Sequence, residues 1–272
     1  MTEQETRFEF GANWRRFLDT LNPARIATAE QSLQLMLGTE TLKDRRFIDV
    51  GCGSGLFSLA ARNLGARVHS FDYDKQSVEC AGVLRQRYWT GDPEWSVEQG
   101  SALDESYMSA LGQHDVVYSW GVLHHTGNMW RALELTSRLV RPGGSLFVSI
   151  YNDQGLTSQR WTRIKRYYSD SPAWRQRLIE WLAFVRVWGP QLTRDFLRGR
   201  GLSTWRNYGM DRGMSAWHDL VDWVGGYPFE VAKPEAIFDF FRERNFVLQR
   251  MKTCGGGWGC NEFVFSRGRD DA

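Results

Sequence analysis

The stretch Phe47–Gly55 constrains the fold more than any other part of this 272-residue chain. A short apolar run ends in the acid Asp49, and three glycines then alternate at Gly51, Gly53 and Gly55. Apolar residues follow at helical spacing, so the stretch predicts a strand, a tight turn and a helix. Glycines in such a turn let the backbone approach a ligand closely, and the helix supplies N–H groups at the same place.

The spacing of these glycines bears on the kind of ligand. The dinucleotide fingerprint is G-x-G-x-x-G, whereas this loop reads G-x-G-x-G and has Leu56 at the next position. A carboxylate at Asp49 would repel a pyrophosphate, but it could accept hydrogen bonds from an ammonium group. The spacing therefore disfavours a dehydrogenase, and an ordinary strand-to-helix turn remains the alternative to a ligand loop.

A second acidic strand end follows at a suggestive distance. The segment Arg67–Asp74 predicts a strand, and its Asp72 lies 21 residues after Gly51. In nucleotide-binding α/β folds an acid at this distance accepts hydrogen bonds from ribose hydroxyls. Asp74 is the better candidate for a helix N-cap, because helix-like sequence follows it.

Two further segments complete a pattern. His114–His125 reads as a strand with the exit loop Val-Leu-His-His, and Arg141–Gly144 (Arg-Pro-Gly-Gly) precedes a strand at Ser145–Ile150. Together with Asp49-x-Gly-x-Gly-x-Gly and Asp72, these motifs resemble the class I S-adenosylmethionine (SAM) dependent methyltransferases. The Val-Leu-His-His form resembles the ubiquinone-biosynthesis-type small-molecule O-methyltransferases.

The resemblance implies a doubly wound, seven-stranded Rossmann-like α/β sheet that is mostly parallel, with an antiparallel last strand. The final helix is expected at Glu235–Arg244, and the last two strands at Phe246–Cys254 and Cys260–Ser266. Residues 46–150 and 232–268 would form the SAM-binding core. Residues 1–45 would form an N-terminal helical lid, and residues 151–231 a helical insertion after strand five.

The resemblance also implies a set of SAM contacts. Ser101 stands where the family usually has an aspartate that binds the adenine amino group, which removes a charge-assisted hydrogen bond there. The aromatic residues Phe10 and Trp14 could cover the sulfonium, although the helix that begins at Pro23 could equally pack on the flank of the sheet. The expected cofactor-binding residues are Phe10, Trp14, Asp49, Gly51, Gly53, Gly55, Asp72, Tyr73, Ser101, Ala102 and Ser119.

The insertion has an unusual composition. Seven of the thirteen tryptophans lie in it, and its twelve Lys and Arg against eight Asp and Glu give a net charge of +4. After an N-cap at Ser171, Trp174, Leu178, Trp181, Val185 and Trp188 form one helical stripe that is expected to end at Gly189-Pro190. The stripe predicts packing either on the main domain or on a second subunit, and the second case would give a homodimer. An aromatic substrate wall is the alternative.

Methyl transfer is an in-line displacement that needs alignment of the acceptor and removal of a proton. Histidine is the natural base near neutral pH, so the candidates are His124, His125 and His218. Trp120, Tyr151 and Asn152 are expected to contact the substrate, because the carboxyl ends of strands four and five lie beside the ligand crevice. No metal site is predicted, since Cys254 and Cys260 lack zinc-knuckle spacing.

Other functions use the same fold. An RNA methyltransferase would need a basic tract, and the cluster Arg160, Arg163, Lys165 and Arg166 is modest, while the whole chain carries a net charge of only +2. A cyclase that converts SAM into azetidine-2-carboxylate and methylthioadenosine, and a non-catalytic SAM-binding regulator, are further alternatives. The sequence shows no membrane span and no signal peptide, so a cytoplasmic protein with free thiols is expected.

Overall fold

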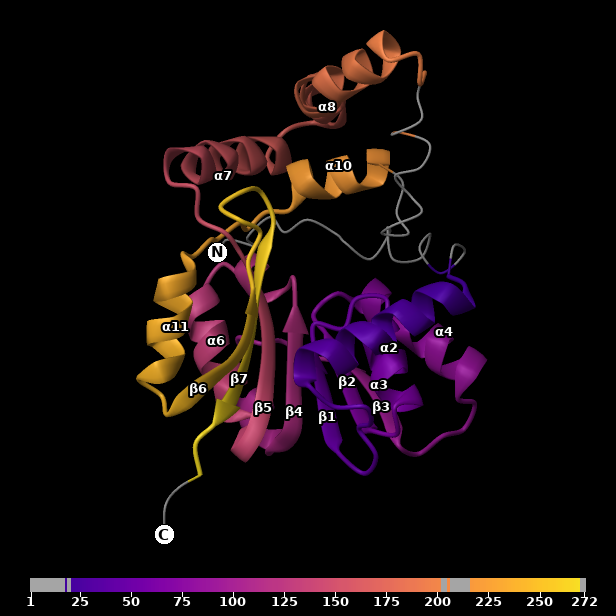
Figure 1. Cartoon of the computed structure of the whole chain (residues 1–272), viewed down its shortest axis with the longest axis vertical. Coiled ribbons are helices and arrows are strands. Elements are labelled where there is room, and N and C mark those ends of the chain that lie inside the picture. The colour runs from indigo at the N-terminus through magenta and orange to yellow at the C-terminus, as the bar shows by residue number, and fades with distance from the viewer. Residues whose placement is uncertain (1–17, 19–20, 202–204, 206–215, 270–272) are drawn as a thin grey trace.

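The computed structural model describes residues 18, 21–201, 205 and 216–269, and its centre is one seven-stranded sheet (Figure 1). The strand order is β3-β2-β1-β4-β5-β7-β6. The strands are β1 (Arg46–Val50), β2 (Arg67–Asp72), β3 (Trp95–Gln99), β4 (His114–Trp120), β5 (Val140–Tyr151), β6 (Phe246–Lys252) and β7 (Cys260–Arg267). Strands β1 to β5 pair in parallel, and β7 runs antiparallel to both β5 and β6. The predicted fold class is confirmed.

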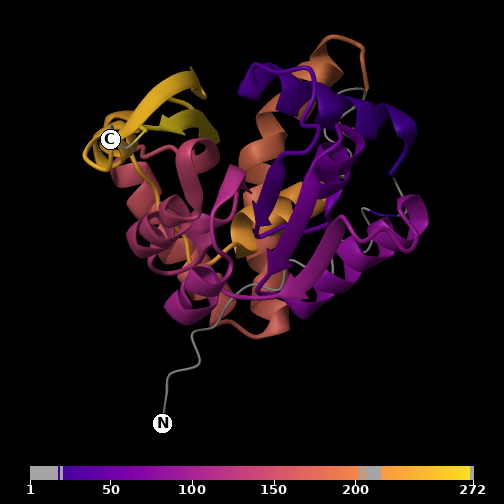
Figure 2. The same cartoon turned by 90° about the horizontal axis from the view of Figure 1, so that it is seen from below.

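Helices cover both faces of the sheet (Figures 1 and 2). On one face, α2 (Pro23–Leu37), α3 (Leu56–Asn63) and α4 (Lys75–Tyr88) enclose a core that includes Phe47 and Trp95. On the other, α5 (Glu105–Ala110), α6 (Met129–Arg138) and α11 (Pro234–Arg242) enclose a second core. Each core is apolar and fully buried, as expected for a parallel sheet. Helix α2 therefore packs on the flank of the sheet, whereas Phe10 and Trp14 lie outside the described residues.

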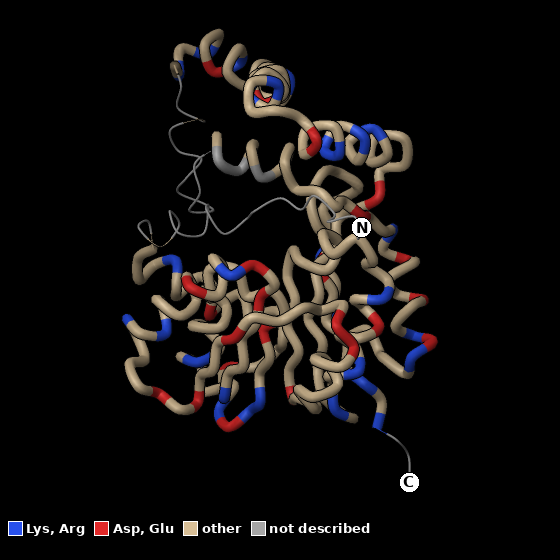
Figure 3. Tube along the Cα trace, turned by 180° about the vertical axis from the view of Figure 1, so that it is seen from behind, with Lys and Arg blue, Asp and Glu red and all other residues tan. Residues whose placement is uncertain are grey.

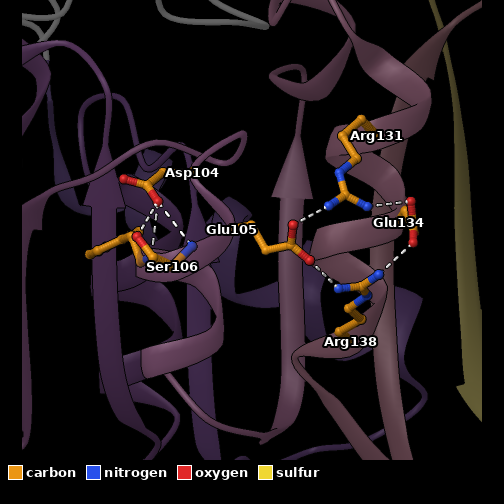
Figure 4. A network of polar contacts seen from close by, with 7 residues as sticks. Asp104, Glu105, Ser106, Arg131, Glu134 and Arg138 are labelled. Carbon is orange, nitrogen blue, oxygen red and sulfur yellow. Dashed lines mark hydrogen bonds and ion pairs between the residues drawn. The ribbon is translucent and has the colours of Figure 1, made fainter.

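A polar network fixes α5 against α6 (Figure 4). Asp104 caps α5 by accepting from the N–H groups of Ser106 and Tyr107. Glu105 then pairs with Arg131 (2.5 Å) and Arg138 (2.8 Å) of α6. These ion pairs are exposed, so their contribution lies in setting the position of α5 more than in stability.

The turn Arg141–Gly144 differs from the prediction. It was expected to separate a helix from strand five, but β5 already begins at Val140, which pairs with His114. The next pair joins Val116 to Ser145, so Arg141–Gly144 bulges out of the strand. Gly143 takes a φ of +74°, which a bulge of this kind needs.

The insertion is a helical subdomain above the carboxyl ends of the parallel strands (Figure 1). Its described helices are α7 (Leu156–Ser169), α8 (Ala173–Leu197) and α10 (Ala216–Gly225). They share a small core of their own, built around Tyr168, Ala183, Leu220 and Val224. The tip of the β6–β7 hairpin reaches up to these helices, because Trp258 contacts Trp161 of α7 and Trp223 of α10.

Two predictions about α8 were wrong. The helix does not end at Gly189-Pro190 but continues through Pro190 to Leu197, because Trp188 and Asp195 are both buried and anchor the helix on either side of the proline. Its N-cap is Pro172, since the hydroxyl of Ser171 donates back to the Tyr167 carbonyl (2.7 Å) instead of capping.

The aromatic stripe of α8 is mostly exposed to solvent. Trp188 is buried, but Trp174, Leu178, Trp181 and Val185 are 53–63% exposed. The stripe therefore does not pack along the main domain in the described residues, and coverage by a second subunit stays a prediction. None of the described helices is long and apolar enough to cross a membrane.

Candidate active site

The glycine loop joins β1 to α3 at the carboxyl end of the sheet. Gly51, Gly53 and Gly55 all have positive φ angles, of +78°, +52° and +79°. A Cβ built on Gly51 would lie 2.3 Å from Val122, and one on Gly55 would lie 2.8 Å from Ala81. The loop is therefore packed closely between the exit of β4 and helix α4, where a side chain at these two positions would not fit.

Asp72 lies at the end of β2, directly beside this loop. Its carboxylate accepts from the N–H groups of Gly53 and Asp74, both at 2.9 Å. Burial raises its pKa to about 6, against the lowering effect of these N–H donors. A carboxylate has about four acceptor sites, so capacity remains for ribose hydroxyls. As predicted, the helix N-cap is Asp74, which accepts from the Gln76 N–H.

Asp49 is placed behind the loop. Its carboxyl is 2% exposed and accepts a hydrogen bond from the Ser58 hydroxyl of α3 (2.5 Å). The chain of donors continues, since Ser70 donates to Ser58 (2.8 Å) and the indole of Trp95 donates to Ser70 (2.9 Å). Burial raises the pKa of Asp49 to about 7, so a nearby cation would stabilise its charge. Sequence reasoning missed Ser58 and Ser70.

The remaining predicted cofactor contacts differ in their access to the crevice. Tyr73 is 58% exposed beside Asp72, and Ser101 is partly buried after β3. Ala102 is buried in the sheet core. Ser119 is fully buried and donates to the Val50 carbonyl (2.9 Å), which ties β4 to β1 under the loop. Ser119 is thus a structural residue under the glycine loop, with no exposed surface for contact with a cofactor.

The two histidines of the exit loop lie in a short 3₁₀ turn, η1 (Leu123–His125), beneath the insertion. His124 is fully buried, and its Nδ1 accepts from the Tyr151 N–H (3.4 Å). The Nδ1 of His125 lies 2.7 Å from the Pro228 carbonyl, so Nδ1 carries the hydrogen and Nε2 is left as an acceptor. Burial, with the charge of Lys165, lowers the pKa of His125 to about 3 and holds that of His124 well below its usual range.

Tyr151 is the centre of an aromatic cluster at the end of β5. Its ring centroid lies 4.0 Å from His124, 5.5 Å from Trp223 and 5.2 Å from Phe229. A narrow pocket opens beside it, with room for about one water molecule. The pocket is lined by Tyr151, Asn152, Gln154, Ser158, Trp161, Trp223, Phe229, Trp258 and Gly259. The structure thus brings Tyr151 and Asn152 together with three tryptophans.

Asn152 connects this pocket to the glycine-rich hairpin between β6 and β7. Its side chain donates to the Gly257 carbonyl (3.2 Å) and accepts from the buried Asn261 (3.0 Å). Trp258, held on this hairpin, stacks on Trp223 with ring centroids 5.6 Å apart. The hairpin therefore forms one wall of the pocket, a role that the sequence pattern did not indicate.

Lys165 of α7 is a residue that sequence reasoning misplaced. It was counted with the surface cluster Arg160–Arg166, but its side chain is fully buried. Its Nζ donates to the Trp223 carbonyl and lies 4.4 Å from the Trp223 ring and 4.6 Å from the Phe229 ring. Figure 3 shows the other cationic positions along α7. A signal was present, because Trp161, Lys165 and Tyr168 share one helix face.

Trp120 and His218 are the remaining predicted site residues. Trp120 lies at the end of β4 and is 42% exposed, on the same edge of the sheet as the histidines. His218 is part of α10, but its side chain lies outside the described residues. In the described part of the chain, no group of three or more His, Cys, Asp or Glu side chains could hold a metal ion.

Two acidic groups lie beside the glycine loop, near the carboxyl ends of adjacent strands. Asp72 keeps acceptor capacity at the end of β2, and Asp49 is buried behind the loop on β1. The fold and this site define a class I SAM-dependent methyltransferase domain. The chain belongs to the family described as "Methyltransferase domain", whose profile matches residues 16–204, and its cofactor is S-adenosyl-L-methionine.

Comparisons with individual proteins agree with this membership. The chain is 28% identical over 148 residues to a ubiquinone biosynthesis O-methyltransferase of Parvibaculum lavamentivorans, a match that covers 50% of this chain and 54% of the relative. The chain thus spans about half the length of the curated relatives that it matches.

Two solved structures share the fold. The magnesium protoporphyrin IX methyltransferase of Synechocystis PCC 6803, with bound SAH, has a TM-score of 0.54 at 14% identity and covers 93% of this chain and 92% of its own. The 1,6-didemethyltoxoflavin-N1-methyltransferase of Burkholderia thailandensis has a TM-score of 0.51 at 12% identity and covers 91% of this chain and 80% of its own.

Proposed function

We propose that this protein transfers the methyl group of SAM to a small biosynthetic acceptor held above the carboxyl ends of β4 and β5. The observation that carries the proposal is the pocket at Tyr151, which the insertion and the β6–β7 hairpin close with aromatic walls. Its lining of aromatic and polar side chains suits a compact acceptor that carries an aromatic ring. The likeness to ubiquinone biosynthesis O-methyltransferases supports an oxygen acceptor.

The chain's own residues would divide the work of the reaction. Bound SAM supplies an electrophilic methyl carbon, activated by the sulfonium charge. The glycine loop and Asp72 would hold the nucleoside, and Tyr151 with Asn152 would orient the acceptor. The Nε2 of His125 would accept a hydrogen bond from the acceptor, because its Nδ1 hydrogen is committed to Pro228. The aromatic walls would exclude water.

One product assay separates this function from its rivals. The pure protein is incubated with SAM alone, and then with SAM and a mixture of phenols, amines and carboxylic acids, and the products are followed by mass spectrometry. We expect S-adenosylhomocysteine, in stoichiometric yield with a methylated product, only when an acceptor is present. Methylthioadenosine in equal yield with azetidine-2-carboxylate, formed from SAM alone and absent without the protein, would instead establish the cyclase and refute methyl transfer.

An RNA acceptor is less well supported by the surface. The basic cluster on α7 loses one of its four members, since Lys165 is buried. The three arginines that remain, Arg160, Arg163 and Arg166, are too few for the extended basic face that RNA binding needs. A small-molecule acceptor therefore remains the proposal.

The histidine proposal can be tested with one substitution. His125→Ala removes the Nε2 acceptor, and we expect kcat/KM to fall about tenfold, the equivalent of one hydrogen bond. His69→Ala is the matched control, because His69 lies on β2 and contacts Ser96 and Glu98, whereas the His125 ring contacts Tyr151 with centroids 5.5 Å apart. The measurement is the initial rate with the acceptor found in the product assay; unchanged turnover of the His125 variant would remove this residue from the mechanism.

We also infer a reducing compartment, the cytoplasm, for this enzyme. Its four cysteines are free thiols, two of them buried. Cys254 donates to the Gly257 carbonyl (3.2 Å), and so the thiol serves the hairpin as a hydrogen-bond donor. This use of cysteine is typical of proteins that keep their thiols reduced.

A further inference from the structure

Helix α8 of the insertion is apolar on two sides, and only one of them is buried. The inner side joins the core of the insertion, where Ala183 is buried. The other side, which we call the outer face of α8, carries five large apolar side chains that are 53–63% exposed: Trp174, Leu178, Trp181, Leu182 and Val185. Exposed apolar side chains gathered on one helix face mark an interaction surface.

The acidic residues of α8 are turned away from this outer face. The helix contains two acids, Glu180 and Asp195. Glu180 accepts a hydrogen bond from the buried Tyr168 hydroxyl of α7 (2.7 Å), and Asp195 is 2% exposed. The inward packing of α8 thus takes up its negative charges.

The arginines of α8, in contrast, are all exposed: Arg175, Arg177, Arg186 and Arg194. On a helix with 3.6 residues per turn, Arg177 lies along one border of the outer face, and Arg175 and Arg186 lie along the other. The guanidinium carbon of Arg175 also lies 5.0 Å from the centre of the Trp174 ring. The apolar outer face is therefore bordered by cations on both sides.

The segment around α8 has the same bias in charge. Residues 156–201, which include α7 and α8, contain ten Lys and Arg against three Asp and Glu, which gives a net charge of +7. The rest of the chain has 24 against 29, which gives a net charge of −5. Figure 1 shows α8 at the end of the molecule farthest from the sheet. The basic segment and its apolar face thus occupy one end of an otherwise acidic protein.

These charges favour an anionic partner over a second copy of this chain. In a symmetric dimer the outer face would meet itself, and its arginine borders would meet the same arginines. Like charges at such a contact are costly. A lipid bilayer suits both features, because tryptophan is enriched at the headgroup level and long cationic side chains reach the lipid phosphates while their stems stay on apolar surface.

We propose that the outer face of α8 docks this protein on the surface of a membrane that contains anionic lipids. The helix lies in the plane of the surface, with its apolar side chains at the boundary between headgroups and acyl chains. The bordering arginines pair with anionic headgroups. This inference concerns binding alone and does not depend on the proposed methyl transfer.

Vesicle binding by the full-length protein tests the proposal. The protein is mixed with vesicles of phosphatidylcholine alone, or of phosphatidylcholine with phosphatidylglycerol, and the bound fraction is measured by flotation. We expect the affinity for the anionic vesicles to exceed that for the neutral ones by about tenfold or more at low salt, and to fall as the salt concentration rises.

A first pair of variants tests the apolar part of the outer face. Trp174→Glu combined with Trp181→Glu should lower the affinity for anionic vesicles by about tenfold or more, because two apolar contacts are replaced by repelled charges. Leu35→Glu combined with Val247→Glu is the matched control. It adds the same charge at apolar positions of similar exposure, 66% and 57%, on α2 and β6, and should retain most of the affinity.

A second pair tests the cationic borders and covers the case in which the tryptophan variant fails to fold. Arg175→Gln combined with Arg177→Gln should lower the affinity for anionic vesicles by about tenfold or more, and leave the weak affinity for neutral vesicles unchanged. Lys43→Gln combined with Arg87→Gln removes two exposed charges from elsewhere and should retain most of the affinity. Circular dichroism checks that each variant is folded.

Three outcomes would overturn the proposal. The first is wild-type protein that binds neither kind of vesicle; a dimer in light scattering that the tryptophan variant splits would then make a second copy the partner. The second is equal binding to neutral and anionic vesicles, which would leave the arginines without a role. The third is a folded tryptophan variant that binds as tightly as the wild type, which would reduce the effect to adsorption by charge.

Discussion

Gly51→Ala is expected to abolish detectable SAM binding and to lower the free energy of unfolding by roughly 2–4 kcal/mol. Two separate causes add. The backbone of Gly51 has a φ of +78°, which an alanine tolerates poorly. The new Cβ would also lie within 2.3–2.9 Å of three Val122 carbons, which a packed side chain cannot absorb without moving.

The matched control for this substitution is Gly91→Ala. Gly91 has almost the same backbone angle, a φ of +72°, but a Cβ there meets no atom within 4 Å. We expect a loss of about 1 kcal/mol from the angle alone and unchanged SAM affinity. Chemical denaturation and calorimetry measure the two quantities; normal SAM binding by Gly51→Ala would show that the donor lies elsewhere.

The clash at Gly51 should reach beyond the donor site. Val122 immediately precedes the turn that carries His124 and His125. Moving Val122 therefore displaces the histidines as well as the glycine loop. The contact between Gly51 and Val122 thus couples the glycine loop to the exit of β4.

Asp72→Asn is expected to weaken SAM binding roughly 10–100-fold, since a hydrogen bond to a charged acceptor contributes about 1.5–3 kcal/mol. The substitution also turns one carboxylate oxygen into a donor, which faces the Gly53 or Asp74 N–H instead of accepting from it. Asp74→Asn is the control, because the Asp74 carboxylate caps α4 by accepting from the Gln76 N–H. Equal affinities for the two variants would remove Asp72 from the ribose site.

The same residue predicts how SAM binding depends on pH. Burial raises the pKa of Asp72 to about 6, and ribose hydroxyls bind the ionised form. Affinity should therefore be complete well above pH 6 and decline as the pH falls through that value. The Asp72→Asn protein should show a smaller decline, because only Asp49, with a pKa of about 7, then titrates beside the loop in this range. Calorimetry across pH 5–8 measures both profiles.

Much of the core could be predicted because short-range signals there agree with the final structure. The alternating glycines at Gly51, Gly53 and Gly55 need positive φ angles, and the structure has them. Asp74 follows a strand and precedes a helix, so its role as a cap was local information. The seven-stranded, mostly parallel sheet with an antiparallel last strand was implied by the family resemblance of these motifs, and the structure confirms it.

The insertion was harder to predict because its local signals conflict with tertiary packing. Gly189-Pro190 normally ends a helix, yet buried Trp188 and Asp195 hold α8 together across it. Lys165 has the composition of a surface residue but the helical position of a core residue, and only the fold decides between them. Asp49 was identified by its motif, whereas its partner Ser58, and Ser70 that donates to Ser58, come from other elements and carry no pattern of their own.

The base of the insertion has a consequence for how such enzymes diversify. The chain leaves the core at Asn152 and returns at Ala232, and these two residues form a β-bridge. The Ala232 N–H donates to the Tyr151 carbonyl (3.0 Å), and the Asp153 N–H donates to Ala232 (3.2 Å). The segment between them is thus closed at its foot, so its length can change at little entropic cost to the sheet. The insertion between Asn152 and Ala232 can then change in evolution, and with it the range of acceptors, while the core that binds SAM stays the same.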